Sequence, residues 1–166
     1  MAQTHTPRAR FLKSFEPEAA KTKQVLRAMP TAAADFRPHD RSNTAMQLGW
    51  TFVMEQHMVV QALRNDFRLG GPRPDKPDSW DGMLAAIDKQ LDDVIAELRS
   101  PDNPNLEGSV EFYVGPKQKG QIPLDEFVEF MLHDQIHHRG QMSVYIRMAG
   151  GKVPAIYGPS ADEPWT

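Results

Sequence analysis

Residues 80–98, WDGMLAAIDKQLDDVIAEL, decide the fold, because apolar side chains recur in them at every third or fourth position. The apolar residues are Trp80, Met83, Leu84, Ile87, Leu91, Val94, Ile95 and Leu98. An α-helix repeats about every 3.6 residues, so this spacing places them on one face. Asp78 or Ser79 can cap the start of this helix. A helix with one continuous apolar face predicts partner helices that bury it.

Three further stretches show helical spacing, and segments rich in proline and glycine separate them. We expect helices over residues 16–28, 44–65 and 123–148, in addition to residues 80–98. Pro17 and Pro123 suit the first turns of two of these helices, where a missing backbone N–H costs little. Residues 101–122 form a connector, in which SVEFYVG (109–115) alternates enough to predict a short extended piece.

The chain of 166 residues is long enough for one hydrophobic core, so we expect a single domain over residues 1–166. Four helices without a strong strand pattern predict an all-α fold, a four-helix bundle with an irregular C-terminal tail. The tail contains apolar and aromatic residues among its prolines and is expected to pack across the helices. Arg139 and Arg147 are expected to pair with its acidic residues, such as Asp162 or Glu163.

The composition excludes several classes of function. A net charge of −3 gives no basic footprint for nucleic acid, so we expect no nucleic-acid partner. No apolar run approaches the roughly 20 residues of a membrane span, and no signal-peptide pattern is present, so we expect a cytoplasmic protein. The absence of cysteine removes thiolate metal sites and cysteine nucleophiles. A metal ion would therefore need His, Asp, Glu or water as ligands.

Three of the six histidines lie in residues 132–141, LHDQIHHRGQ. If Arg139 faces solvent, a rotation of about 100° per residue predicts which side chains face inward. The expected inward stripe is Phe130, Asp134, His137, Gln141, Val144 and Met148. Its polar middle needs a compensating partner, because burying unpaired polar groups is unfavourable. A metal ion is one such partner, since helical bundles hold ions between facing helices.

Two pairs of side chains in this stretch have the i, i+4 spacing that lets one helix face hold an ion. His133 with His137 is one pair, and Asp134 with His138 is the other. A polar surface or a dimer-facing surface would also account for the cluster. The residues alone leave these alternatives open.

The run HHRGQMSVYIRMAGGKVPAIYGPSADE (137–163) resembles the C-terminal signature of the DinB/YfiT-like metalloenzyme family. Residues 21–56, KTKQVLRAMPTAAADFRPHDRSNTAMQLGWTFVMEQ, are similar to the first two helices of that family. The resemblance implies a four-helix bundle of up-down-down-up topology that is commonly a homodimer. It also implies a divalent metal ion, nickel or zinc in many members, held by one His of the second helix and an H-x-x-x-H pair of the fourth.

The family register selects particular residues of this chain. The second His of the pair precedes Arg-Gly-Gln, so it corresponds to His138, and the first corresponds to Asp134. The His of the second helix corresponds to Thr51, so two of three positions depart from the pattern. Glu55 lies one turn after Thr51 and reaches further, so we expect Glu55, Asp134 and His138 as ligands. Zinc and manganese accept such oxygen ligands, and nickel is the third candidate.

An alternative register uses His57, His133 and His137, which would require the second helix to rotate. A third alternative is a chain that has lost the ion and kept the fold. Gln141 is expected either to orient a metal ligand by a hydrogen bond without binding the ion itself, or to join two helices through a hydrogen bond.

Two functions are consistent with these features. The first is a metal-dependent enzyme acting on a small molecule, a transferase or hydrolase that in some relatives uses a low-molecular-weight thiol. The second is a non-catalytic dimeric protein, for stress response or binding, without the ion. The absence of His at Thr51 and Asp134 favours the second.

Overall fold

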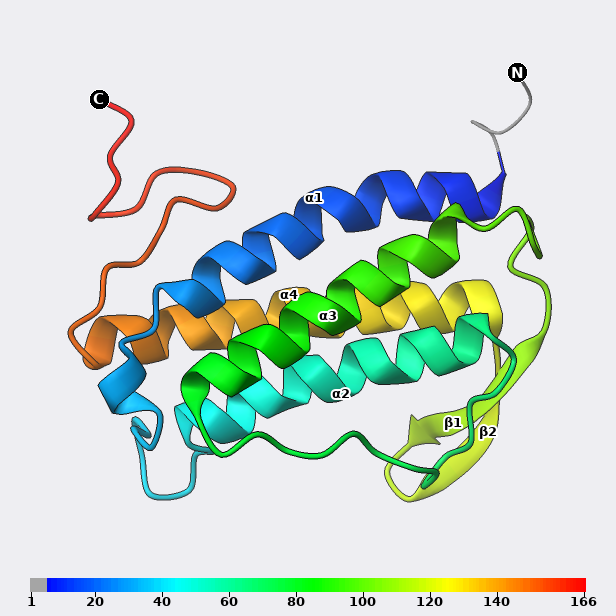
Figure 1. Ribbon diagram of the computed structural model, residues 1–166, viewed down its shortest axis with the longest axis horizontal. Helices are drawn as coiled ribbons and strands as arrows, with labels where there is room; N and C mark the ends of the chain where they lie inside the picture. The colour runs from blue at the N-terminus through cyan, green and yellow to red at the C-terminus, as the bar shows by residue number, and fades with distance from the viewer. Residues whose placement is uncertain (1–5) are drawn as a thin grey trace.

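The computed structural model describes residues 6–166, and in them four long helices lie side by side (Figure 1). The helices are α1 (Pro7–Arg27), α2 (Ala45–Leu63), α3 (Trp80–Arg99) and α4 (Leu124–Met148). In Figure 1, α2 and α3 run in one direction, and α1 and α4 run in the opposite direction. Both α1 and α2 pack against α3 and against α4. Over these described residues, no helix is long and apolar enough to cross a lipid bilayer.

The helix α3 has the bounds and the buried face that its sequence predicts. Its buried residues are Trp80, Met83, Ile87, Leu91, Val94 and Leu98. Ser79 caps its start, because the hydroxyl accepts a hydrogen bond from the Gly82 backbone N–H at 3.1 Å. The helix α2 begins with a reciprocal cap, in which Thr44 and Gln47 each accept from the backbone N–H of the other.

The start expected for the first helix was wrong, since α1 begins at Pro7 rather than near residue 16. Pro7 occupies the first turn, Thr6 caps it, and Pro17 lies inside the helix on the exposed side. Phe11 and Phe15 explain the extension, because both are buried in the core before Pro17. Their burial favours a continuous helix and offsets the cost of an internal proline, about 3 kcal/mol.

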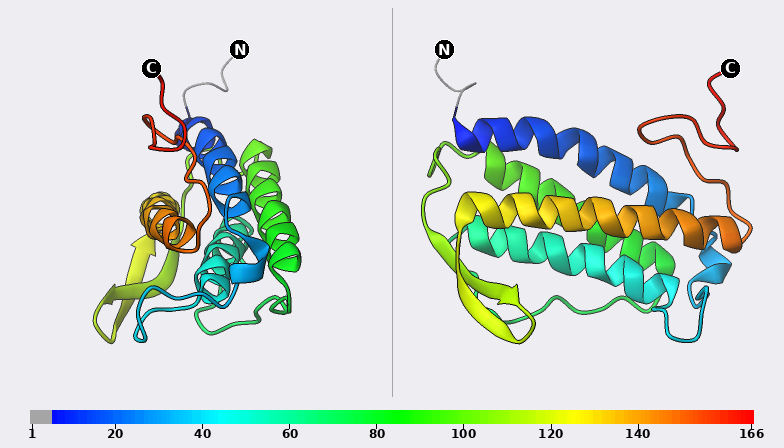
Figure 2. Two further views of the ribbon diagram at one scale, coloured as in Figure 1. Left: turned by 90° about the vertical axis from the view of Figure 1, so that its left-hand side faces the viewer. Right: turned by 180° about the vertical axis from the view of Figure 1, so that it is seen from behind.

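The expected all-α fold is corrected to a mostly helical fold with a small antiparallel hairpin. Strands β1 (Ser109–Gly115) and β2 (Gln118–Pro123) pair directly ahead of α4 (Figure 2). The expected extended piece at 109–115 is confirmed as β1. The sequence of β2, QKGQIP, lacks the alternation that signals a strand and has only one β-branched residue, Ile122. The hairpin docks through Phe112, whose ring lies 5.3 Å from the ring of Phe127.

The C-terminal tail, residues 149–166, forms neither helix nor strand and is tied to α4 by ionic contacts. Arg147 pairs with Asp162 at 2.6 Å, as the sequence predicted. The same carboxylate accepts a hydrogen bond from the Val153 backbone N–H at 2.8 Å. These contacts close the tail into a compact loop beside the end of the helix.

Arg139 is buried, so the expectation that it faces solvent was wrong. Its side chain is 1% exposed and pairs with the Glu18 carboxylate of α1. One guanidinium nitrogen also donates to the Glu18 backbone carbonyl at 3.1 Å, and the other lies 2.5 Å from the Tyr157 hydroxyl of the tail. The cation therefore joins α4 to α1 and to the tail.

The expected inward stripe of α4 was also wrong in its phase, because it was measured from Arg139. Phe130, Val144 and Met148, expected inside, are each about half exposed at 47%, 53% and 55%. The residues that face the core are Leu124, Phe127, Val128, Met131, Leu132, Gln135, Arg139, Met142, Tyr145 and Ile146. The outward face of α4 thus keeps an apolar character that none of the other described helices covers.

The contact between Arg139 and Glu18 predicts a stability that depends on pH. Burial alone would raise the pKa of Glu18, but hydrogen bonds from Lys21, Tyr157 and Arg139 outweigh it and lower the pKa. A lowered carboxyl pKa adds stability above its unfolded value, about 4.3, and that stability is lost as pH falls through the folded value.

Glu18→Gln is therefore expected to lower the free energy of unfolding by about 3 kcal/mol at pH 7, because it leaves a buried cation unpaired. The difference from the wild type should shrink below about pH 4. Urea unfolding across pH 3–7 measures both effects. The control is Glu111→Gln on the exposed face of β1, which removes the same charge without unpairing a buried cation. An equal effect of both variants would refute the interpretation.

Candidate metal centre

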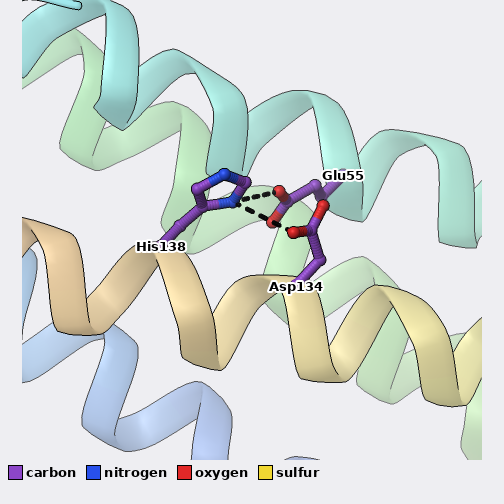
Figure 3. Close-up of side chains that lie close together, drawn as sticks. All are labelled: Glu55, Asp134 and His138. Atoms are coloured by element: carbon purple, nitrogen blue, oxygen red, sulfur yellow. Dashed lines mark hydrogen bonds and ion pairs between the residues drawn. The ribbon is translucent and has the colours of Figure 1, made fainter. Parts of the chain in front are cut away.

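Glu55, Asp134 and His138, the ligands expected from the sequence, converge between α2 and α4 (Figure 3). Glu55 comes from the middle of α2, and Asp134 and His138 come from successive turns of α4. The Glu55 Oε1 atom lies 2.6 Å from Nδ1 of His138, and the Asp134 Oδ1 atom lies 3.8 Å from it. One ligand atom from each residue lies within 4.8 Å of the other two.

The local structure explains this convergence. Asp134 and His138 are four residues apart, so they lie on one face of α4. The antiparallel α2 presents Glu55 to that face, and Phe52 of the preceding turn packs edge-on against the His138 ring at 6.1 Å. Glu55 is buried with 2% exposure, whereas Asp134 and His138 are partly exposed. The three side chains therefore line a site that is closed by the core on one side and open to solvent on the other.

The electrostatics of the site favour a proton between the buried Glu55 and the partly exposed His138 near neutral pH. Burial raises the pKa of Glu55 to about 7, although the hydrogen bond and the charge of His138 act against it. The hydrogen bond with Glu55 raises the pKa of His138, and this outweighs the opposite effect of burial. A divalent cation would replace that shared proton, because both groups bind metals in their deprotonated forms.

An unpaired atom supports the fit of a cation here. The Oε2 atom of Glu55 is buried and has no hydrogen-bond partner among the described residues, which is unfavourable for a carboxylate. Two carboxylates and one imidazole form a donor set suited to a divalent ion. Ligand atoms on one such ion lie roughly 3.0–3.4 Å apart, given bonds of about 2.1 Å. The 2.6 Å contact between Glu55 and His138 would therefore have to open by about half an ångström.

Comparison with known proteins shows the family of this chain. The model of the DinB family matches residues 1–165 of the chain. The chain belongs to the DinB family. The uncharacterized protein YrdA of Bacillus subtilis (strain 168) is 27% identical over 156 residues, which cover 92% of this chain and 89% of YrdA.

Two crystal structures of DinB-like proteins have the same fold. One is from Bacillus cereus ATCC 10987, with a TM-score of 0.73 and 22% identity, covering 89% of this chain and 95% of that one. The other is YjoA of Bacillus subtilis, with a TM-score of 0.70 and 13% identity, covering 87% of this chain and 96% of that one. At these identities the likeness establishes the fold alone.

The alternative register is not brought together in this DinB protein. His57 faces the loop after α2, where its Nε2 atom lies 3.3 Å from the Pro72 carbonyl. His133 lines a cavity between α1 and α4, and His137 is exposed on the outward face. In the part of the chain that the structure describes, the only group of three acidic or imidazole side chains placed to share an ion is Glu55, Asp134 and His138.

Two further residues of the sequence analysis take other positions. Thr51, at the family position for the ligand of the second helix, donates its hydroxyl to the Gln47 carbonyl of its own helix at 3.2 Å. Gln141 contacts His137 at 2.8 Å rather than any of the three converging side chains. The structure therefore gives Gln141 no contact that would orient His138.

A set of buried polar residues that was not predicted from the sequence lies behind the site. The Gln56 amide donates to the side-chain carbonyl of Gln135 at 3.0 Å, and the Gln135 amide donates to the Thr22 hydroxyl at 2.6 Å. All three side chains are buried. A helical wheel phased on the apolar Phe127 and Met131 would have placed Gln135 inside, whereas one phased on an arginine did not.

The two registers predict opposite effects of neighbouring substitutions. His138→Ala is expected to lower the affinity for a divalent ion by at least about 100-fold, because it removes the only nitrogen ligand. His137→Ala, next to it on the exposed face, is the matched control and should leave the affinity unchanged. Isothermal titration of untagged protein with Zn²⁺, Mn²⁺ and Ni²⁺ measures both. The reverse order of effects would favour the alternative register.

Proposed function

We propose that this DinB protein is a divalent-metal-dependent enzyme acting on a small molecule, with Glu55, Asp134 and His138 as the metal ligands. The observation that supports it most directly is the buried, unpaired Oε2 atom of Glu55, a residue with one carboxylate oxygen within 4.8 Å of ligand atoms of Asp134 and His138. Burying a carboxylate oxygen without a partner is unfavourable unless a cation binds to it.

The metal ion would supply a Lewis acid that polarises a substrate oxygen or lowers the pKa of bound water or thiol. The residues of this chain would hold it and leave its outward side open, because Asp134 and His138 are partly exposed. Two carboxylates make the donor set harder than three imidazoles would be, which favours manganese or zinc over softer ions. A transferase or hydrolase reaction, with or without a low-molecular-weight thiol, uses such an ion.

A cavity between the first half of α2, the loop before it and the second half of α4 supports a small substrate. It has a volume of about 370 Å³ and is lined by Ser42, Asn43, Leu48, Gln141, Val144 and Tyr145. Gln141 follows His138 by three residues, which is about 4.5 Å along the helix axis. Leu48 precedes Glu55 by two turns on α2. No ionisable carboxylate or amine lines this cavity, so it suits an uncharged part of a substrate whose reacting group reaches the ion.

A homodimer belongs to the same proposal. The outward face of α4 exposes Phe130, Val144 and Met148, and apolar patches on a helix favour association with a second copy. The up-down-down-up bundle, expected from the family resemblance, is supported by the helix directions in Figure 1. A cytoplasmic location and the absence of a nucleic-acid partner complete the proposal.

The rival function is a non-catalytic binding or stress-related protein that has lost its ion. The direct hydrogen bond between Glu55 and His138 favours it, because a proton already joins the two groups. The rival predicts that neither His138→Ala nor Asp134→Asn changes metal content or ligand binding.

The function is tested by turnover that depends on the ion. Protein purified without an affinity tag and loaded with Mn²⁺, Zn²⁺ or Ni²⁺ is expected to consume a low-molecular-weight thiol with an electrophilic acceptor, or to hydrolyse a small ester or amide. His138→Ala should abolish the reaction, and His137→Ala should retain it. Failure of the wild-type chain to bind any of these ions would sink the proposal.

The dimer is tested by one charge on the outward face of α4. Val144→Glu places a carboxylate among exposed apolar side chains and is expected to convert a dimer into a monomer, because burying an unpaired charge is costly. Asp81→Asn on the exposed side of α3 changes a charge on another helix, away from this patch, and is the control. Sedimentation velocity measures the mass, and a monomeric wild-type protein would rule the dimer out.

A further inference from the structure

A continuous chain of hydrogen bonds passes through the interior behind the candidate metal centre. It begins at the partly exposed Glu18, which accepts from Arg139, and it continues from Arg139 to the Thr22 hydroxyl at 3.4 Å. Gln135 donates to the same hydroxyl at 2.6 Å and accepts from Gln56 at 3.0 Å. Thr22, Gln56, Gln135 and Arg139 are each at most 1% exposed. The chain therefore joins α1, α2 and α4 through fully buried side chains.

Each hydrogen bond in this chain has a defined donor and acceptor. A guanidinium can only donate, so the Thr22 hydroxyl accepts from it. Thr22 also accepts from the Gln135 amide group, which leaves the Gln135 carbonyl oxygen to accept from Gln56. The carbonyl oxygen of Gln56 then ends the chain, and it has no partner among the described residues. This chain of hydrogen bonds is polar throughout. Gln56, at the end opposite Glu18, directly follows Glu55 in the sequence.

Each candidate metal ligand directly precedes one member of this chain. The three pairs are Glu55 with Gln56, Asp134 with Gln135, and His138 with Arg139. Successive residues of a helix point about 100° apart. One residue of each pair therefore faces the groove between α2 and α4, and the other faces the interior. The two residues of a pair are adjacent on one helix. A contact that fixes the rotation and the axial position of the inner residue therefore also fixes those of the ligand next to it.

Apolar packing alone does not supply that accuracy. Hydrophobic cores accept many combinations of side chains and lose a unique arrangement before they lose stability. Metal ligands need distances within about 0.2 Å, and a slide or rotation of α4 against α2 would exceed that. A direct hydrogen bond between Gln56 and Gln135 admits one relative register of these two helices.

We propose that the buried chain of Gln56, Gln135, Thr22 and Arg139 positions the helices so that Glu55, Asp134 and His138 meet around one ion. These four are positioning residues and do not touch the ion or a substrate. The inference rests on the proposed function, since it presumes that the three ligands bind a metal.

The test compares two substitutions of Thr22. Thr22→Val keeps the shape and removes the hydroxyl, whereas Thr22→Ser keeps the hydroxyl and removes a methyl group. Thr22→Val is expected to lower the affinity for Zn²⁺ or Mn²⁺ about tenfold or more, the usual effect of losing a residue that orients ligands. Thr22→Ser should stay within about twofold of the wild type, because its oxygen can accept the same hydrogen bonds.

Two controls separate positioning from a general loss of stability. Ile87→Val and Val94→Ala each weaken the core of α3, a helix with no metal ligand and no member of the hydrogen-bonded chain. The control is whichever of the two lowers the melting temperature by the same amount as Thr22→Val. It should bind the ion as the wild type does. The absorption spectrum of bound Co²⁺ reports ligand geometry and should change in Thr22→Val only.

Gln56→Met keeps the inference falsifiable if Thr22→Val does not fold. It removes the unpaired buried oxygen of Gln56 but leaves the buried Gln135 carbonyl oxygen without its donor, so the two effects oppose each other and the melting temperature of the metal-free protein should change little. Metal affinity should nevertheless fall. Wild-type affinity in both Thr22→Val and Gln56→Met, or an equal loss in the α3 control, would overturn the inference. A wild-type chain that binds no ion would instead overturn the proposed function.

Discussion

The buried guanidinium of Arg139 is the constraint on which the rest of the molecule depends. A permanent cation with 1% exposure must be paired, and Glu18 of α1 supplies the charge while Thr22 and Tyr157 supply further contacts. Satisfying it fixes which side of α4 faces inward. The apolar face of α4, the hydrogen-bonded chain to α2 and the direction of His138 all follow from that orientation.

The helices that are plainly amphipathic were the predictable part of the fold. Residues 80–98 gave α3 with its cap and its buried face, because apolar periodicity alone determines such a helix. Strand β2 and the first turns of α1 were not predictable in this way. QKGQIP has no strand pattern, and an internal proline at 17 argued for a boundary that the burial of Phe11 and Phe15 overrides.

The candidate site was predicted by one route and missed by another. The family register around Arg-Gly-Gln selected Asp134 and His138, and the reach of a carboxylate selected Glu55, the three side chains that converge. The helical wheel failed, because it assumed that an arginine faces solvent. A charged residue is buried when its partner lies on another helix, and a partner 121 positions away leaves no local signal in the sequence. Gln56, Gln135 and Thr22 were overlooked for the same reason.

The separation between α1 and α4 along the chain also orders the events of synthesis. Glu18 and Thr22 are made first, and their partners on α4 follow only after α2, α3 and the hairpin. Until residues 124–148 leave the ribosome, the interior lacks one of its four helices and the groove lacks two of its three ligands. The centre is therefore completed only once residue 138 of α4 has been made, and every partly made chain that ends before it lacks the centre.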